Sequence, residues 1–208
     1  MIRIALTKGR IEEKAIEIFE KAGYDCSPLH NKGRKLFFCI APDVEVVLAK
    51  ANDVITYVEH GVCDMGVVGK DTIMEMGRSL YEVMDLGFGK CRFALACKKG
   101  TDFFEGYSHK TIASKYPNVT KEYFRSLGLD VEVVKIEGSV ELAPLLGLAD
   151  GIVDIVETGS TLKENGLEVV RDVAPISARL VVNTASIKLK KNQVDKIIDD
   201  IAKALKEL

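Results

Sequence analysis

The segment 141–166 constrains the fold most strongly, because an apolar run, a glycine-centred loop and a short amphipathic stretch follow one another within it. Residues 151–156 have the composition of a short buried strand. Residues 162–165 form an amphipathic segment that ends at Gly166, so the loop 158–161 stands at the start of a helix. A strand that passes through a short loop into a helix is typical of α/β proteins.

The loop 158–161, with the sequence Thr-Gly-Ser-Thr, has the groups that bind a phosphate. Backbone N–H groups at a helix start are unpaired and carry partial positive charge. Gly159 allows close approach of a ligand, and the three hydroxyl side chains add donors. Asp154 and Glu157 precede the loop, and their carboxylates suit either ribose hydroxyls or Mg²⁺ beside a phosphate. A loop that merely caps a helix is the alternative interpretation.

A second candidate for anion binding lies near the first residue of the chain. Lys8, Gly9 and Arg10 follow an expected strand at 2–6 and precede an expected helix at 11–22. Two basic side chains therefore lie beside another helix start. Solvated charges at a strand end are the alternative interpretation.

Strands and helices are expected to alternate along the whole chain. Further apolar patterns predict strands or extended segments at 36–40, 44–48, 63–69, 81–86, 91–97, 110–114, 131–136 and 178–184, and helices at 73–76, 117–127 and 190–208. Asn52 and Asp53 are expected to cap a helix that runs to residue 59, and Pro175 to mark a turn. Residues 61–64 and 147–150 share the pattern Gly-x-x-Asp before a strand, a loop and a helix, which predicts a repeated unit.

The fold class that follows is α/β, with two lobes of mixed or mostly parallel sheet and flanking helices. Two crossovers would join the lobes, as in periplasmic binding proteins. We expect one lobe to comprise 1–86 together with 178–208, and the other to comprise 87–177.

The composition narrows the classes of function. The chain has 208 residues, of which 47% are hydrophobic and 29% charged, and this suits two small globular lobes. Its formal net charge of −2 gives no general attraction for nucleic acid. No secretory segment or membrane-length apolar run is present, so we expect a cytoplasmic protein. The five cysteines are expected to be reduced core residues, and the three histidines lack the spacing of zinc ligands.

The segment 141–162 resembles, in fixed register, the signature of the ATP phosphoribosyltransferases that open histidine biosynthesis. The matching positions are Glu141, Gly147, Ala149, Ile152, Asp154, Ile155, Thr158, Gly159, Thr161 and Leu162. Lys8-Gly9-Arg10 and the pattern Gly61-x-x-Asp64-x-Gly66-x-x-Gly69-x-Asp71 resemble the same family. The resemblance implies transfer of the 5-phosphoribosyl group from phosphoribosyl pyrophosphate to N1 of ATP, with release of pyrophosphate and with Mg²⁺ as cofactor.

The resemblance also implies roles for individual residues. Thr158, Gly159, Ser160 and Thr161 would bind the 5′-phosphate of phosphoribosyl pyrophosphate, and Asp154 and Glu157 would bind its ribose or the metal. The expected catalytic residues are Lys8, Arg10, Glu141 and Asp154, with the two basic ones holding pyrophosphate or triphosphate. Glu141 either contacts ligand or supports the loop.

The resemblance implies that ATP is bound by six residues, which are Lys8, Arg10, Lys50, Asp71, Thr72 and Arg92. Asp71 is equally suited to cap a helix. The family usually has an arginine where this chain has Lys50, and a proline where it has Ile55. Lysine cannot make a bidentate guanidinium contact, which weakens the case for Lys50 at a phosphate.

The length resembles the short form of the family, which works with a separate regulatory subunit similar to histidyl-tRNA synthetase. The resemblance thus implies self-association, a hetero-octamer with that subunit and feedback by histidine through it. A two-lobed solute-binding module is the rival from another class. A phosphoribosyltransferase for another base would keep the loop 158–161 and change the acceptor site.

Overall fold

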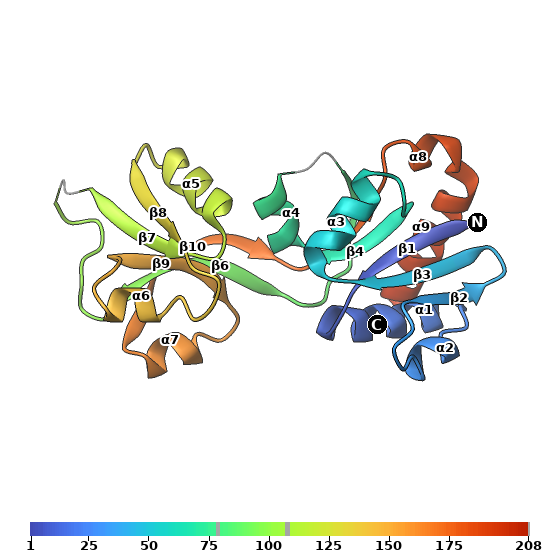
Figure 1. Cartoon of the computed structure of the whole chain (residues 1–208), viewed down its shortest axis with the longest axis horizontal. Coiled ribbons are helices and arrows are strands. Elements are labelled where there is room, and N and C mark those ends of the chain that lie inside the picture. The colour runs from blue at the N-terminus through green and yellow to red at the C-terminus, as the bar shows by residue number, and fades with distance from the viewer. Residues whose placement is uncertain (78–79, 107–108, 208) are drawn as a thin grey trace. The chain divides into compact units, whose positions relative to one another are not determined.

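The structure, a computed structural model, describes residues 1–77, 80–106 and 109–207. The chain forms two compact units, unit 1 (Met1–Gly89 and Ser177–Leu208) and unit 2 (Lys90–Ile176), whose elements are drawn in Figure 1. Each unit has one mixed sheet with helices against it, so the predicted α/β class is confirmed. No helix in the described ranges is long and apolar enough to cross a membrane.

Unit 1 is built on a six-stranded sheet. Its elements are β1 (Ile2–Thr7), α1 (Arg10–Lys21), α2 (Ser27–His30), β2 (Phe37–Ala41), β3 (Val44–Ala49), α3 (Ala51–Glu59), β4 (Met65–Gly69), α4 (Lys70–Met76), β5 (Tyr81–Asp85), β11 (Ala178–Val182), α8 (Ser186–Leu189) and α9 (Lys191–Lys206). The strand order is β2-β3-β1-β4-β11-β5. β1, β3 and β4 run parallel, whereas β2, β5 and β11 are antiparallel to their neighbours.

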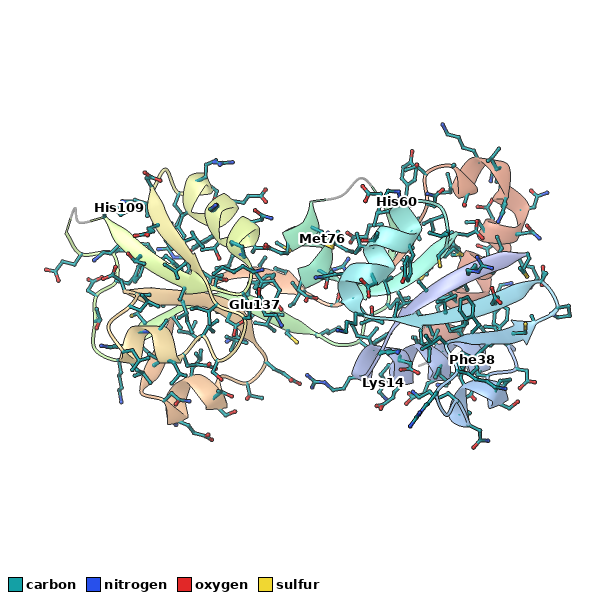
Figure 2. All side chains as sticks on the ribbon, in the orientation of Figure 1. Lys14, Phe38, His60, Met76, His109 and Glu137 are labelled. Carbon is teal, nitrogen blue, oxygen red and sulfur yellow. The ribbon has the colours of Figure 1, made fainter. Side chains whose placement is uncertain are left out.

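Apolar side chains cover both faces of this sheet. Phe19 of α1, Leu29 of α2 and Ile197 of α9 share a core with alternate strand residues on one face. Phe38, labelled in Figure 2, belongs to the same core. α3 packs on the other face through residues such as Val58. The prediction that the last helix packs on the first lobe is thereby confirmed.

Unit 2 is built on a five-stranded sheet. Its elements are β6 (Cys91–Lys98), β7 (Lys110–Ser114), α5 (Pro117–Ser126), β8 (Val131–Lys135), α6 (Leu142–Leu145), β9 (Gly151–Val156), α7 (Ser160–Glu164) and β10 (Leu167–Ile176). The order is β10-β6-β9-β7-β8, with β7 parallel to β8 and β9, and β6 antiparallel to β9 and β10. Ala143 of α6 and Leu162 of α7 share one core, and α5 lies on the opposite face (Figure 1).

The two sheets contain the same arrangement of four strands. β1 lies between its parallel neighbours β3 and β4, with β11 antiparallel beyond β4; β7 lies likewise between β8 and β9, with β6 beyond β9. Asp64, directly before β4, accepts a hydrogen bond from the backbone N of Arg3 at 3.0 Å. Asp150, directly before β9, accepts one from the backbone N of Thr111 at 2.7 Å. The repeated unit predicted from Gly-x-x-Asp is confirmed, and its aspartate joins two parallel strands.

Two local predictions were wrong because tertiary position overrode side-chain preference. β10 continues through Pro175, which lies opposite Arg92 of β6 rather than in a turn. β10 is an edge strand, where the missing N–H of proline is tolerated. The N-cap of α3 is Lys50, so Asn52 and Asp53 lie inside its first turn. The chain passes from β3 into this helix without a linker.

The cysteine prediction holds for three of the five residues. All five are free, and Cys26, Cys63 and Cys97 are buried. Burial raises the pKa of the Cys26 thiol to about 12 and that of Cys63 to about 11, which makes both poor nucleophiles. Cys39 is exposed because it faces outward from the edge strand β2.

Asp64 also binds the last part of unit 1 to its first strand. The carboxylate accepts hydrogen bonds from Ser186 Oγ at 2.6 Å and from Lys190 Nζ at 2.8 Å, besides the one from Arg3 N. Burial alone would raise the pKa of Asp64, but the hydrogen bonds from Lys190, Ser186 and Arg3 outweigh it and hold the pKa below 3.8. The folded state therefore favours the ionised carboxylate.

We expect Asp64→Asn to lower the free energy of unfolding at neutral pH by about 2 kcal/mol, because Lys190 loses its anionic partner. The wild-type contribution is complete above the unfolded pKa of 3.8 and is lost as pH falls through the lower folded pKa. Urea unfolding from about pH 7 down to about pH 3 measures the difference between the two proteins, which should shrink towards acid. Asp150→Asn, the matched change in unit 2, should cost less. A difference for Asp64→Asn that does not vary with pH would contradict this account.

Candidate functional site

The loop 158–161 lies at the carboxyl end of β9, where the chain enters α7. Gly159 is the N-cap of α7 and has a φ of 80°, in the left-handed region that favours glycine. Thr158 Oγ1 accepts a hydrogen bond from the backbone N of Ser160 at 3.4 Å and lies 3.1 Å from Ser160 Oγ. Thr158, Ser160 and Thr161 are all exposed. The loop therefore offers hydroxyl groups at its surface, as a phosphate site requires.

Asp154 lies in β9, upstream of this loop, and is half-buried. Burial raises the pKa of its carboxyl above 3.8 and the charge of Glu141 adds to the rise, while the backbone of Ile155 and the charge of Lys115 oppose it. Glu141 is the N-cap residue of α6, and Lys115 directly follows β7. The structure thus brings Asp154 into electrostatic contact with Glu141. A carboxyl group with a perturbed pKa beside an exposed loop of hydroxyl side chains is a candidate for a functional site.

Arg92 lies in unit 2 and reaches the beginning of the same loop. Its Nε donates to Asp172 Oδ1 at 2.6 Å, and its Nη1 donates to the backbone O of Glu157 at 3.4 Å. The sequence placed Arg92 at a crossover on the ATP side. In the structure it belongs to β6, next to β9, and supports the chain that leads into the loop 158–161.

Three other predicted residues of unit 1 lie at the carboxyl ends of parallel strands. Lys8 and Arg10 follow β1, and Lys50 follows β3. The backbone N of Lys8 donates to the O of Ala49 at 3.0 Å, so the two basic segments are joined. All three cationic side chains are exposed. Since the carboxyl ends of neighbouring parallel strands meet at one edge of the sheet, these three residues lie at the same edge.

Asp71 and Thr72 lie at the same edge, in the first turn of α4 after β4. Thr72 is buried, and its Oγ1 is 3.4 Å from Asp71 Oδ2. The N-cap of α4 is Gly69, so Asp71 is not the cap residue. Its charge in the first turn nevertheless favours the helix start.

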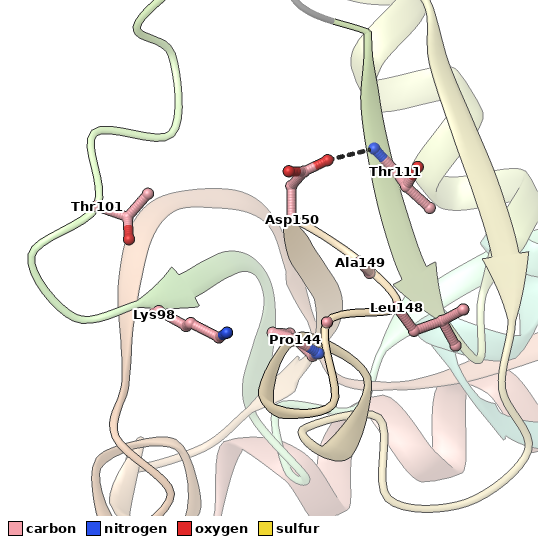
Figure 3. Close-up of a pocket in the computed structure, with 8 residues that line it drawn as sticks. Lys98, Thr101, Thr111, Pro144, Leu148, Ala149 and Asp150 are labelled. Carbon is pink, nitrogen blue, oxygen red and sulfur yellow. Dashed lines mark hydrogen bonds between the residues drawn. The ribbon is translucent and has the colours of Figure 1, made fainter.

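A cavity of about 350 Å³ lies at the other end of β9, away from the loop 158–161. Figure 3 shows the residues that line it, which are Lys98, Thr101, Thr111, Pro144, Gly147, Leu148, Ala149 and Asp150. The predicted site residues do not line it. Gly147 and Ala149 of the signature do, which means that these signature positions form the turn before β9 rather than the loop after it.

The carboxylates near the loop 158–161 suit a metal ion that takes most of its ligands from substrate phosphates and water. Within residues 1–77, 80–106 and 109–207, no three His, Cys, Asp or Glu side chains are grouped so as to hold a metal. Asp154 is half-buried and Glu157 exposed. Mg²⁺ commonly binds one or two carboxylates together with substrate phosphates and water, and these two residues suit that mode.

Lys115 was missed by the sequence analysis. It directly follows β7, which is paired with β9. The positive charge of its exposed side chain lowers the pKa of Asp154 in β9. The available signal was its place immediately after an expected strand at 110–114; in the structure Lys8 and Lys50 likewise follow β1 and β3 directly.

The fold and site define a two-unit α/β protein with exposed hydroxyl and basic side chains after the carboxyl ends of its strands. The chain belongs to the ATP phosphoribosyltransferase family, whose model matches residues 50–203. A relative from Clostridium kluyveri, named ATP phosphoribosyltransferase, is 62% identical over 208 residues, which are 100% of this chain and 95% of that protein. A relative of the same name from Clostridium acetobutylicum is 59% identical over 201 residues, 96% of this chain and 94% of that protein.

Solved structures agree with this assignment. The chain is similar to one described as the "ATP phosphoribosyl transferase (HisG:HisZ) complex from Thermotoga maritima", with a TM-score of 0.85, 34% identity, and coverage of 100% of this chain and 98% of that one. The Bordetella pertussis BvgS periplasmic VFT2 domain shares the fold alone, with a TM-score of 0.57 at 13% identity over 99% of this chain and 92% of that domain. The predicted resemblance to the ATP phosphoribosyltransferases and the periplasmic-protein-like fold are both confirmed.

Proposed function

We propose that the chain transfers the 5-phosphoribosyl group of phosphoribosyl pyrophosphate to N1 of the adenine of ATP. The products are phosphoribosyl-ATP and pyrophosphate, and the reaction is the first step of histidine biosynthesis. The observation that carries the proposal is the exposed loop 158–161 at the end of β9, with the half-buried Asp154 upstream in the same strand. Family membership supports the same reaction.

Phosphoribosyl pyrophosphate is assigned to unit 2. Its 5′-phosphate accepts hydrogen bonds from the hydroxyl and backbone groups of the loop 158–161. Asp154 accepts hydrogen bonds from the ribose hydroxyls, and its negative charge stabilises the positive charge that develops at the anomeric carbon. The charge of Glu141 raises the pKa of Asp154, so Glu141 is assigned to the surroundings of that carboxyl group. Arg92 supports the loop through the carbonyl of Glu157.

Polyphosphate groups are assigned to the basic strand ends of unit 1. Lys8 and Arg10 hold the pyrophosphate or the triphosphate, and Lys50 adds a point charge rather than a bidentate contact. Asp71 of α4 is assigned to ATP binding. The buried Thr72 holds the Asp71 carboxylate through a hydrogen bond from its hydroxyl group.

The reaction is a substitution at an anomeric carbon. The lone pair of adenine N1 forms the new bond as the bond from carbon to pyrophosphate breaks, so no general base is required. Mg²⁺, when bound, neutralises charge on the departing pyrophosphate. Asp154 and Glu157 are the residues that would hold it. The chain's own residues orient the two substrates and balance the developing charges.

The test is to incubate the chain with ATP, phosphoribosyl pyrophosphate and Mg²⁺, alone and with a candidate regulatory subunit, and to assay phosphoribosyl-ATP. We expect product that depends on all three additions. Binding of both substrates without product in either condition would favour a binding module. Product with a different base in place of ATP would favour another phosphoribosyltransferase.

We also propose a regulatory partner of the HisZ type, similar to histidyl-tRNA synthetase, in a hetero-octamer that includes self-association of this chain. The support is the similarity to the chain in the HisG:HisZ complex of Thermotoga maritima. Co-purification with such a subunit, and inhibition by histidine only in its presence, is the expected result. Full inhibition of the isolated chain by histidine would overturn it. Since the reaction consumes ATP, we assign it to the cytoplasm.

A further inference from the structure

Glu12 is a buried carboxylate to which the proposed reaction gives no role. It lies in the first turn of α1, and its side chain is only 2% exposed. Oε1 lies 2.6 Å from Lys32 Nζ, and Oε2 accepts a hydrogen bond from the backbone N of Gly9 at 3.3 Å. A carboxylate is removed from water at substantial cost, and here both of its oxygens are used to offset that cost.

Both partners of Glu12 belong to basic segments. Gly9 stands between Lys8 and Arg10, the residues assigned to polyphosphate. Lys32 begins the segment 32–35, Lys-Gly-Arg-Lys, which we call the basic turn. The turn is closed by the hydrogen bond from the backbone N of Lys35 to the O of Lys32 at 3.0 Å.

The basic turn lies beside the end of β3, where Lys50 follows. The residue after the turn, Leu36, accepts a hydrogen bond through its backbone O from the N of Leu48 at 3.0 Å. β2 then continues antiparallel to β3, with Phe37 opposite Val47. The basic turn and the segment 8–10 are thus at the same edge of the sheet of unit 1, and Glu12 bridges them.

We infer that Glu12 is a positioning residue for polyphosphate binding: its two oxygens fix the segment 8–10 and the basic turn in one arrangement. The inference rests on the proposed function for the identity of the ligand. Direct electrostatic attraction cannot be the role of Glu12, because a negative charge beside an anion site opposes binding. If Glu12 positions the basic segments, removing its charge weakens polyphosphate binding. If its charge acts only by repelling the anion, removing it strengthens binding.

The main test measures binding of pyrophosphate and of ATP to the full chain by isothermal titration calorimetry. Glu12→Gln keeps an oxygen for Gly9 N and loses the ion pair, and we expect it to raise the Kd for pyrophosphate about tenfold, since small displacements of binding groups have effects of this size or larger. Glu12→Ala loses both bonds and should raise Kd further. In activity assays of wild type and variants, KM should rise for ATP or for phosphoribosyl pyrophosphate, whichever has its polyphosphate group at this site. The kcat should stay within about twofold of wild type.

Glu13→Gln is the matched control. Glu13 is the next residue in α1, is exposed, and carries the same charge. Its replacement should leave Kd unchanged within about twofold or lower it slightly, as simple electrostatics predicts. Equal weakening by Glu13→Gln and Glu12→Gln would show a general effect of the helix charge and would overturn the inference.

Lys32→Gln tests the other end of the bridge and protects against a folding defect in the Glu12 variants. Lys32 is 43% exposed, so the change should be tolerated by the fold. It should raise Kd for pyrophosphate as Glu12→Gln does, and the double variant should bind no worse than the single ones, since the pair acts as a unit. Wild-type affinity in both Glu12→Gln and Lys32→Gln, with Tm values showing folded protein, would refute the inference.

The binding readout separates this inference from the proposed function. A chain that makes no phosphoribosyl-ATP but loses pyrophosphate affinity on Glu12→Gln would contradict the reaction and support the positioning role. A chain that makes product, with Kd and KM unaffected by Glu12→Gln, would support the reaction and contradict the role.

Discussion

Replacing Asp154 by asparagine is expected to lower kcat about 100-fold while raising the melting temperature at neutral pH. The loss of rate follows from removing the charge assigned to the developing positive centre. The gain in stability follows from the pKa of Asp154, which burial raises above 3.8 in the folded state. As pH rises through the interval between the unfolded and folded pKa values, ionisation is disfavoured in the folded state, so the wild type loses stability that the neutral amide retains.

Product formation gives kcat, and differential scanning calorimetry at about pH 7 and about pH 3 gives Tm. The difference in Tm should disappear at the lower pH, where the wild-type carboxyl is protonated. Asp130→Asn is the matched control, because Asp130 is exposed in the turn between α5 and β8 of the same unit. A kcat within about threefold of wild type would contradict the catalytic role. A lower Tm for Asp154→Asn would contradict the account of burial.

The second large effect is expected from Gly159→Ala, which should raise KM for phosphoribosyl pyrophosphate about 30-fold and change KM for ATP less than about threefold. The added Cβ has room, since its nearest neighbour would be Val156 Cγ1 at 3.8 Å. The damage comes from the φ of 80°, which costs a residue with a Cβ roughly 1 kcal/mol or more. The loop relieves that strain by turning its backbone N–H groups away from the phosphate.

Gly166→Ala provides a matched control for backbone strain. Gly166 follows the other end of α7, has a φ of 70° and has open space around the Cβ position. The variant should lose as much thermal stability as Gly159→Ala and keep both KM values. Equal rises in KM for the two substrates with Gly159→Ala, or a similar rise with Gly166→Ala, would rule out the phosphate assignment of the loop.

The elements of unit 2 that depend on local sequence could be predicted closely. β7 and β9 have the predicted bounds, because each is an apolar run with a sharp end. A loop and a helix start were also expected after β9, but α7 begins at Ser160, two residues earlier than predicted, so Ser160 and Thr161 lie in its first turn. Elements that depend on position in the sheet could not: Pro175 lies inside β10 because β10 is at an edge, and no local pattern shows which strand is an edge.

The same division holds for the site. Lys8, Lys50 and the loop 158–161 could be chosen as candidates from the sequence because each begins two residues after an expected strand. The parts that were missed depend on contacts between segments distant in sequence. Lys115 gains its significance only from the pairing of β7 with β9, and Glu12 only from burial against the segment that contains Lys32. An ordinary amphipathic pattern gives no sign that one glutamate of α1 faces inward.

The interruption of unit 1 by unit 2 sets an order on folding during synthesis. Unit 2 occupies the continuous stretch Lys90–Ile176, whereas β5 must wait for β11, its neighbour in the sheet, which begins only at Ala178. On the ribosome, all of unit 2 is therefore made before the sheet of unit 1 can be completed. Until β11 and α9 emerge, the nascent chain exposes an unpaired β4 edge and the apolar face that α9 later covers, which makes this the stage at which a chaperone would protect it.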